Sequence, residues 1–229
     1  MRTPARIAAL LAVLLPAAAS AWIYPEHRDI AVAAVARLPP ADREALERLW
    51  AEARRGHEAR LCEKPSEGDQ GLSPKCLDFA ALPAISGDHA CSPRQLMETV
   101  LGADWILGVA RVAAETKEAL ATAESRPQKL QRWATSNIEL QRVDKDYATR
   151  AGANNAHFLL PRTGNDPGDF LRSSAKEGAP LNALGLYIQY HLTALAHAQR
   201  LAATAPGPDR AELARQVVAL EGFAFHWME

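Results

Sequence analysis

The sequence predicts an all-α protein that folds as a single helical domain. Alanine and leucine are abundant in this chain of 229 residues, 48% of which are hydrophobic, and both residue types favour helices. Runs of β-branched residues with the alternating pattern of a strand are scarce, so nothing in the sequence indicates a β-sheet. The length suits one domain with a substantial core.

The first 21 residues have the three parts of a secretory signal peptide, and we expect them to be removed. These parts are a basic start with Arg2 and Arg6, an apolar stretch over 7–15, and the small residues Ala19, Ser20 and Ala21 before the cut. The apolar stretch is shorter than the ~20 residues that cross a bilayer. We therefore expect an exported protein, secreted or periplasmic, whose mature domain covers 22–229 and begins at Trp22.

Two helices are expected at the start of the mature chain. The first covers 26–38, where apolar residues recur on one face before Pro39 stops the helix. The second covers 41–55 and has acidic residues in its first turn, where they complement the helix dipole. From 56 to 93 the pattern changes to Gly, Pro, Ser, Asp and Cys, which indicates a long irregular segment of the kind that often carries function.

Five further helices are expected after this segment. Ser92 precedes a proline in the pattern of an N-cap, and the apolar spacing around Trp105 predicts a long helix. Asp144 separates the next two helices, a Gly-Asn-Asp-Pro-Gly turn over 164–168 precedes the fourth, and an Ala-Pro-Gly-Pro linker over 205–208 precedes the last. The expected helices are 101–123, 128–142, 147–160, 181–203 and 209–229.

Three cysteines, Cys62, Cys76 and Cys91, lie within the irregular segment. Export permits disulfides, and an odd count predicts one structural pair across a loop with one thiol left over. The spacing lacks the close Cys-x-x-Cys pairs of a zinc knuckle, so we assign these cysteines no catalytic role. The spacing leaves the pairing open.

The charge balance argues against one class of function. Loss of Arg2 and Arg6 from the 26 Lys and Arg of the whole chain leaves 24, against 27 Asp and Glu. A protein that binds nucleic acid by bulk charge needs a basic excess, which this chain does not have.

Candidate zinc ligands lie near the start of the mature chain and near the end of the sequence. The free amine and carbonyl oxygen of Trp22 form a potential metal chelate, and a turn could bring His27, five residues later, back towards them. His226 lies on the last expected helix, and neutral imidazole is a common zinc ligand.

The irregular segment supplies a second group of candidate ligands. Asp78 and His89 provide a carboxylate and an imidazole, which are ligand types that zinc takes. Asp88 is adjacent to His89 and competes with Asp78 for the role of the carboxylate ligand.

Together these residues resemble the ligand set of the zinc-dependent phospholipase C and single-strand-specific nuclease superfamily, whose all-helical members hold three zinc ions in a cleft. The resemblance implies that Trp22 binds zinc through its amine and carbonyl, aided by His27. It also implies that Asp78, His89 and His226 bind a second zinc, and that Asp78 is catalytic because it orients the attacking water.

The resemblance covers 22–229, with motifs at the two ends and helical character between them. The family motif continues with an Asp four residues after the histidine that matches His226 and with further histidines beyond it. The sequence ends at Glu229, so we expect a member that is incomplete at its C-terminus.

The function that the resemblance implies is hydrolysis of a phosphodiester by water that zinc activates. The expected substrate is a phospholipid head group or single-stranded nucleic acid, and the lack of a basic excess favours phospholipid or a small phosphodiester. We expect a monomer without a transmembrane segment. The alternative is a non-catalytic helical binding protein that retains part of a metal site.

Extra residues ahead of Trp22 are expected to weaken one zinc site, because the terminal amine would become an amide that cannot coordinate. The measurement is the zinc content of the protein beginning at Trp22, compared with one that carries Gly-Ser before it. Equal zinc content in the two proteins would remove the basis for a terminal chelate.

Overall fold

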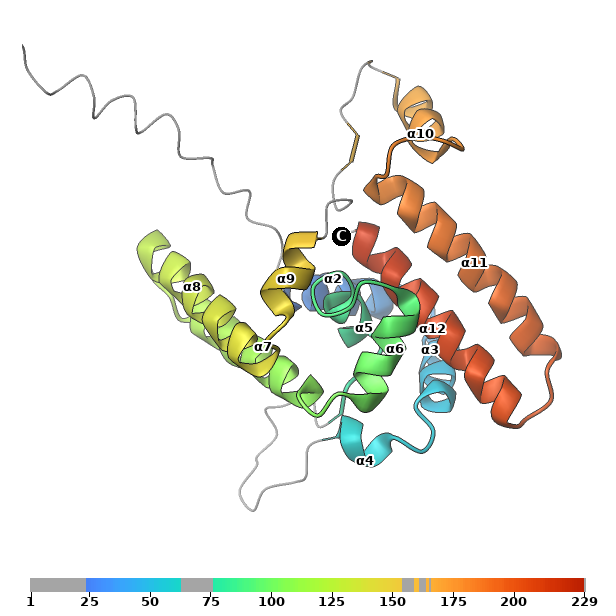
Figure 1. The fold of residues 1–229 in the computed structure, drawn as a ribbon, viewed down its shortest axis with the longest axis horizontal. Helices are drawn as coiled ribbons and strands as arrows, with labels where there is room; N and C mark the ends of the chain where they lie inside the picture. Colours follow the sequence, from blue (N-terminus) through green and yellow to red (C-terminus); the bar gives the residue numbers. More distant parts are fainter. Residues whose placement is uncertain (1–23, 63–75, 154–158, 161–163, 165, 229) are drawn as a thin grey trace, which may run out of the picture.

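The computed structural model describes residues 24–62, 76–153, 159–160, 164 and 166–228, and these residues form helices joined by short connections (Figure 1). They contain no β-strand, only two isolated bridges, Cys62 to Cys76 and Ser86 to Ala90. The predicted all-α fold class is confirmed. The helices are α2 (Tyr24–Arg37), α3 (Pro40–Ala53), α4 (Glu58–Leu61), α5 (Ala81–Ile85), α6 (Pro93–Gly102), α7 (Ile106–Ala121), α8 (Arg126–Val143), α9 (Tyr147–Ala153), α10 (Pro167–Ala175), α11 (Ala183–Ala203) and α12 (Pro208–Met228).

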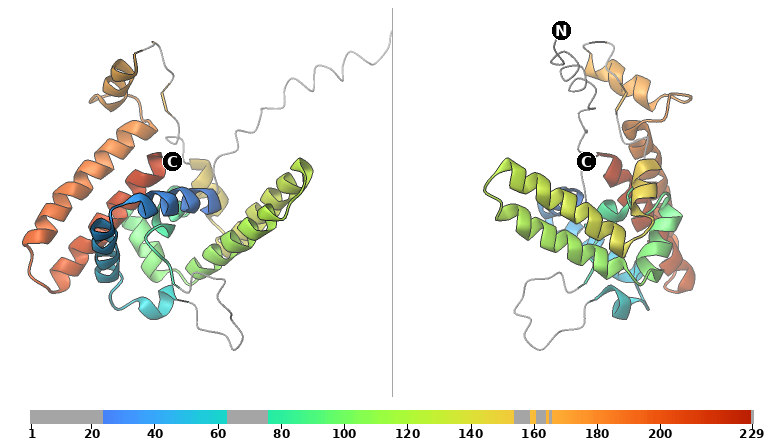
Figure 2. Two further views of the ribbon diagram at one scale, coloured as in Figure 1. Left: turned by 180° about the vertical axis from the view of Figure 1, so that it is seen from behind. Right: turned by 60° about the vertical axis from the view of Figure 1, so that its left-hand side comes forward.

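Two antiparallel helix pairs flank a group of shorter helices. One pair is α7 with α8, and the other is α11 with α12 (Figures 1 and 2). Helix α12 also packs against α3, α5 and α6, while α2 packs against α5 and α7. Helix α12 therefore packs against more of the other helices than α2, α7 or α11 does.

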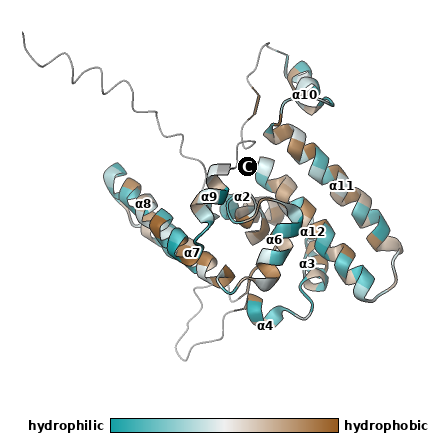
Figure 3. Cartoon of the chain, in the orientation of Figure 1, coloured by the Kyte–Doolittle hydropathy of each residue, from teal (hydrophilic) through white to brown (hydrophobic). Residues whose placement is uncertain are grey.

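The core is built on α12 because this helix is apolar on several sides. Its buried side chains come from all along its length, which is the pattern of a helix enclosed by others. Helix α11 differs, since polar and apolar residues follow one another along it (Figure 3), and Leu192 and Leu195 on it are exposed. None of the helices in the described part of the chain is both long enough and apolar enough to cross a membrane.

Local capping residues fix the ends of several predicted helices. The Ser92 hydroxyl accepts a hydrogen bond from the Gln95 amide at 3.2 Å and begins α6. Ser125 and Gln128 form a capping box that begins α8, and Asp144 is the residue at which α8 ends. Because these signals are local, they could be read in the sequence.

The single long helix expected over 101–123 is wrong at its start. Helix α6 already covers the beginning of this range and ends at Gly102, Ala103 has an extended backbone, and α7 begins at Ile106. The break turns the chain so that buried Ile106 and Val109 of α7 join the core. Burial of these side chains overrides the continuous apolar pattern of the sequence.

Three short helices were not predicted. Helices α4 and α5 lie in the segment expected to be irregular, and α10 follows the predicted turn over 164–168. The Asp166 carboxylate accepts a hydrogen bond from the Gly168 amide at 2.9 Å and thereby caps α10. The expected helix over 147–160 appears as α9, which ends at Ala153, and residues 154–158 lie outside the described residues.

Cys62 and Cys76 form a disulfide, and Cys91 is a free, exposed cysteine. The prediction of one pair and one remaining thiol is therefore confirmed. The disulfide joins the end of α4 to the chain that leads into α5. A hydrogen bond from the Leu77 amide to the Leu61 carbonyl, at 2.8 Å, joins the same two segments. The segment that carries the candidate ligands Asp78, Asp88 and His89 is thus tied to the core at its start.

Replacing Gly222 with Ala is expected to destabilise the protein. A Cβ atom at Gly222 would lie 3.0 Å from Leu82 Cβ and 3.4 Å from Leu96 Cδ2. Leu82 Cβ can move only with its backbone, and overpacking of this kind costs about 1–3 kcal/mol, of which the helix propensity of Ala offsets about 1 kcal/mol. Chemical denaturation should show a net loss of roughly 1 kcal/mol in the free energy of unfolding.

The matched control is Gly152→Ala in α9, where a Cβ atom meets nothing within 4 Å. It should leave stability unchanged or slightly raised. A Gly222→Ala protein that is as stable as the parent would contradict the close approach of α12 to α5.

Candidate functional site

Two fully buried histidines from the two ends of the described chain lie against each other. His27 is on the first turns of α2, on the same buried face as Tyr24 and Ala31. His226 is near the end of α12, one helical turn after Gly222, and its ring centroid lies 4.6 Å from that of His27. The structure thus brings together two of the predicted zinc ligands, which are 199 positions apart in the sequence.

A backbone carbonyl fixes the protonation of His226. Its Nδ1 atom lies 3.1 Å from the carbonyl oxygen of Pro83 on α5. A carbonyl oxygen can only accept, so Nδ1 carries the proton and Nε2 carries the lone pair when the ring is neutral. Metal-bound histidines have this arrangement, in which one ring nitrogen donates to the protein and the other binds the metal.

Asp88 adds a buried carboxylate beside His27. It lies in the tight turn after α5, where Gly87 has a φ of 75° and its amide donates to the Ala90 carbonyl at 2.9 Å. Burial raises the pKa of Asp88 to about 6, and the nearby His27 opposes the rise. The raised pKa means that the ionised carboxylate is destabilised at this position, which a bound cation would reverse.

His89 follows Asp88 in this turn but has a separate set of partners. Its Nδ1 atom lies 2.7 Å from the Asp144 carboxylate, and its ring stacks on Tyr147 with the centroids 4.9 Å apart. Burial lowers the pKa of His89, while the hydrogen bond and charge of Asp144 oppose this and Arg150 adds to it. Its Nε2 atom is buried and has no hydrogen-bond partner among the residues that the structure describes.

Asp78 is engaged outside this cluster. Its carboxylate accepts a hydrogen bond from Arg28 at 2.6 Å and one from the Ala81 amide at 3.1 Å, at the start of α5. The side chain is 47% exposed, whereas Asp88 is buried. The metal-ligand and catalytic roles of Asp78 therefore stay predictions, and Asp88 is the carboxylate that lies next to a candidate histidine.

The described residues supply the ligand types of a zinc site but not a complete ligand set. In this part of the chain, no group of three or more His, Cys, Asp or Glu side chains is arranged to hold a metal ion. Trp22, the predicted terminal chelate, lies outside the described residues. The buried, unpartnered Nε2 atom of His89 and the destabilised carboxylate of Asp88 nevertheless fit a site that takes a cation.

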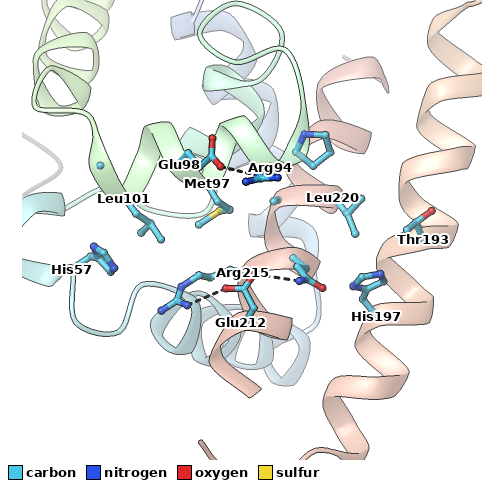
Figure 4. Close-up of a pocket in the computed structure, with 14 residues that line it drawn as sticks. His57, Arg94, Met97, Glu98, Leu101, Thr193, His197, Glu212, Arg215 and Leu220 are labelled. Atoms are coloured by element: carbon cyan, nitrogen blue, oxygen red, sulfur yellow. Dashed lines mark hydrogen bonds and ion pairs between the residues drawn. The ribbon is translucent and has the colours of Figure 1, made fainter. Parts of the chain in front are cut away.

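The remaining described histidines lie elsewhere. His191 on α11 lies 2.9 Å from the Glu221 carboxylate on α12. His57 and His197 line a separate cavity of about 910 Å³ between α6, α11 and α12 (Figure 4). The arginines of this cavity pair with glutamates on their own helices, Arg94 with Glu98 and Arg215 with Glu212. The cavity contains none of the predicted zinc ligands.

Asp144, Tyr147 and Arg150 belong to the site and were missed from the sequence. Asp144 was recognised only as a break between two helices, and an aspartate near a helix end is ordinarily a cap. Their association with His89 depends on how the corner between α8 and α9 packs against the turn after α5. The sequence contains no local signal for that packing.

No protein-family model, curated protein or solved structure matches the chain.

Replacing Asp88 with Asn is expected to stabilise the metal-free protein at neutral pH. The pKa of Asp88 is about 6 in the folded state and 3.8 as its ordinary value, so the folded protein binds more protons between these pH values. Stability of the parent should therefore fall as pH rises from about 4 to 6, by up to about 3 kcal/mol from this group. Asp88→Asn removes this contribution.

The measurement is the free energy of unfolding in the presence of a chelator at pH 4, 5, 6 and 7. The difference between parent and Asp88→Asn should grow across this range, whereas the exposed Asp104→Asn should run parallel to the parent. Parallel curves for Asp88→Asn would show that its carboxylate is not destabilised by burial.

Proposed function

We propose that the chain is an exported zinc-dependent phosphodiesterase that hydrolyses a phospholipid head group or single-stranded nucleic acid. The observation that carries the proposal is the buried contact of His27 with His226, next to Asp88. An imidazole pair with a carboxylate is a ligand combination that zinc uses in hydrolases. Polar groups are costly to bury, so the burial of two imidazoles against each other, with a buried carboxylate that one of them influences electrostatically, supports a ligand-binding role.

In this proposal the residues of the chain hold zinc and keep it in a dry environment. His226 is oriented by the Pro83 carbonyl, and His27 by its place on the buried face of α2. Asp88 takes the carboxylate role that the resemblance gave to Asp78, while Asp78 supports α2 through Arg28. Trp22 is proposed to complete the set through its terminal amine and carbonyl.

Bound zinc would supply Lewis-acid chemistry towards a phosphoryl oxygen and towards water. The chain would contribute the orientation of its ligands and the exclusion of bulk water, since His27, His89 and His226 are all fully buried. Asp88 would have to be ionised to bind zinc. Its raised pKa predicts that zinc affinity falls below about pH 6.

One observation favours a second candidate function. The described residues contain no group of three donors arranged for a metal, as a complete zinc centre would require. A non-catalytic helical binding protein that keeps a partial metal site would look the same in this respect. The alternative predicts weak or no zinc binding and no hydrolysis.

The test is to measure zinc content and hydrolysis by the protein that begins at Trp22. Substrates are phosphatidylcholine, single-stranded DNA and a small chromogenic phosphodiester. His27→Ala and His226→Ala should each lower hydrolysis by at least about 100-fold, since even residues that only support a ligand account for 10- to 100-fold. His57→Ala, in the separate cavity, should leave hydrolysis unchanged.

The outcomes separate the two candidates. Zinc binding together with hydrolysis that depends on His27 and His226 supports the phosphodiesterase. Zinc binding without hydrolysis of any of the three substrates contradicts the phosphodiesterase, and weak or no zinc binding together with no hydrolysis supports the binding protein. A parent protein that binds no zinc contradicts the proposed enzyme.

A further inference from the structure

His89 is held by groups that come from three other parts of the chain. Its ring stacks on Tyr147 of α9, lies edge-on to Tyr24 of α2 at 6.3 Å between centroids, and is tilted against Trp105 at 5.8 Å between centroids. Its side chain is completely inaccessible to solvent. A ring enclosed in this way keeps one orientation.

Asp144 determines which ring nitrogen carries the proton. Its carboxylate, 2.7 Å from His89 Nδ1, is itself buried at the end of α8. The Asp146 amide donates to the other carboxylate oxygen at 3.2 Å, which holds the group in place. Arg150 donates to both oxygens of the Asp144 carboxylate. The carboxylate is thus an acceptor, and Nδ1 of His89 is the donor.

Arg150 forms an ion pair with Asp144. One terminal nitrogen of its guanidinium contacts both oxygens of the Asp144 carboxylate. The guanidinium also lies over the Trp105 ring, with its central carbon 5.9 Å from the ring centroid. Trp105 therefore packs against both His89 and Arg150, the two residues that Asp144 joins by hydrogen bonds.

The arrangement leaves one polar atom unused. His89 Nε2 is buried and has no partner among the described residues. A buried polar atom without a hydrogen bond lowers the stability of the folded protein by about 1–3 kcal/mol. With the proton on Nδ1, Nε2 carries a lone pair. A buried lone pair held in a fixed orientation is what a metal ligand requires, and a carboxylate behind the imidazole is the common supporting group.

We propose that Asp144 and Arg150 are positioning residues that hold His89 with its proton on Nδ1, so that Nε2 serves as a zinc ligand. The choice of zinc rests on the function proposed above, whereas the protonation of the ring does not. Asp144 acts on the ring directly, and Arg150 acts through Asp144. Neither side chain is proposed to touch the metal or the substrate.

The first test measures the tautomer of His89 in the metal-free parent protein. Long-range ¹H–¹⁵N NMR spectra at neutral pH should show the proton on Nδ1 and a lone pair on Nε2. A proton on Nε2, or a ring protonated at both nitrogens, would overturn the positioning role. This measurement needs no variant and no activity.

The second test compares Asp144→Asn with Asp146→Asn. Both changes remove one carboxylate within 4 Å of Arg150, but Asp146 is 79% exposed and does not contact His89. Asp144→Asn should shift the His89 tautomer towards Nε2–H, because the amide can donate to Nδ1, and should weaken zinc binding by 10- to 100-fold. Asp146→Asn should change neither.

Arg150→Lys provides a milder change in case Asp144→Asn does not fold. Lysine keeps the positive charge but lacks the planar guanidinium that contacts both carboxylate oxygens. Zinc affinity should fall by a smaller factor than in Asp144→Asn, with the Nδ1 proton retained. Parent-like zinc affinity in both Asp144→Asn and Arg150→Lys would overturn the proposal.

The results also distinguish this proposal from the proposed function. A parent protein with the Nδ1 proton that binds no zinc overturns the enzyme and the ligand role of His89. A parent that binds zinc and hydrolyses phosphodiesters, and whose Asp144→Asn variant keeps its tautomer and zinc affinity, overturns the positioning role alone.

Discussion

The fold depends on the burial of α12 by its neighbours. Helices α3, α5, α6 and α11 all pack on it, and its apolar residues supply a large part of the common core. This enclosure places His226, near the end of α12, in an environment without water. Every polar group that enters the same region must therefore find its partner within the protein, or remain unsatisfied at a cost of about 1–3 kcal/mol.

The polar groups of the site meet this requirement in different ways. His226 has a backbone carbonyl as its partner, and His89 has a buried carboxylate that is paired with an arginine. Asp88 is less well compensated, since its pKa rises despite the presence of His27. The site is thus held in place at His226 and His89, whereas the carboxylate of Asp88 is electrostatically uncompensated. The zinc that we propose would supply a positive charge beside this carboxylate.

Much of the fold could be predicted because its signals are local. Ser92 caps α6 as its sequence indicates, and Asp144 ends α8 where a break was expected, whereas α8 begins at Arg126, two residues before the expected start. The break between α6 and α7 could not be predicted, since it depends on where Ile106 packs in the finished core. Periodicity within one segment contains no information about the segments that will cover it.

The residues of the site likewise divide into those that the sequence could identify and those that only the packing reveals. Histidine is scarce in this chain, so His27, His89 and His226 could be selected by type and position, and the structure buries all three. Aspartates are numerous, and neither spacing nor composition distinguishes a ligand from a cap. Tertiary packing decides which aspartate meets which partner. It places Asp78 on Arg28 and Asp144 on His89, and it brings Asp88 near enough to His27 for an electrostatic interaction.

The position of the short helix α5 explains how residues from both ends of the chain come together. Helix α5 packs on α2 and on α12, and the turn that follows it carries Asp88 and His89. Its residue Pro83 binds His226 directly. A ligand held by His27 and His226 would join α2 to α12 across α5, so binding would favour the folded arrangement of all three helices. Such coupling between metal binding and folding is expected wherever the ligands come from distant parts of a chain, because the unfolded chain has no site to offer.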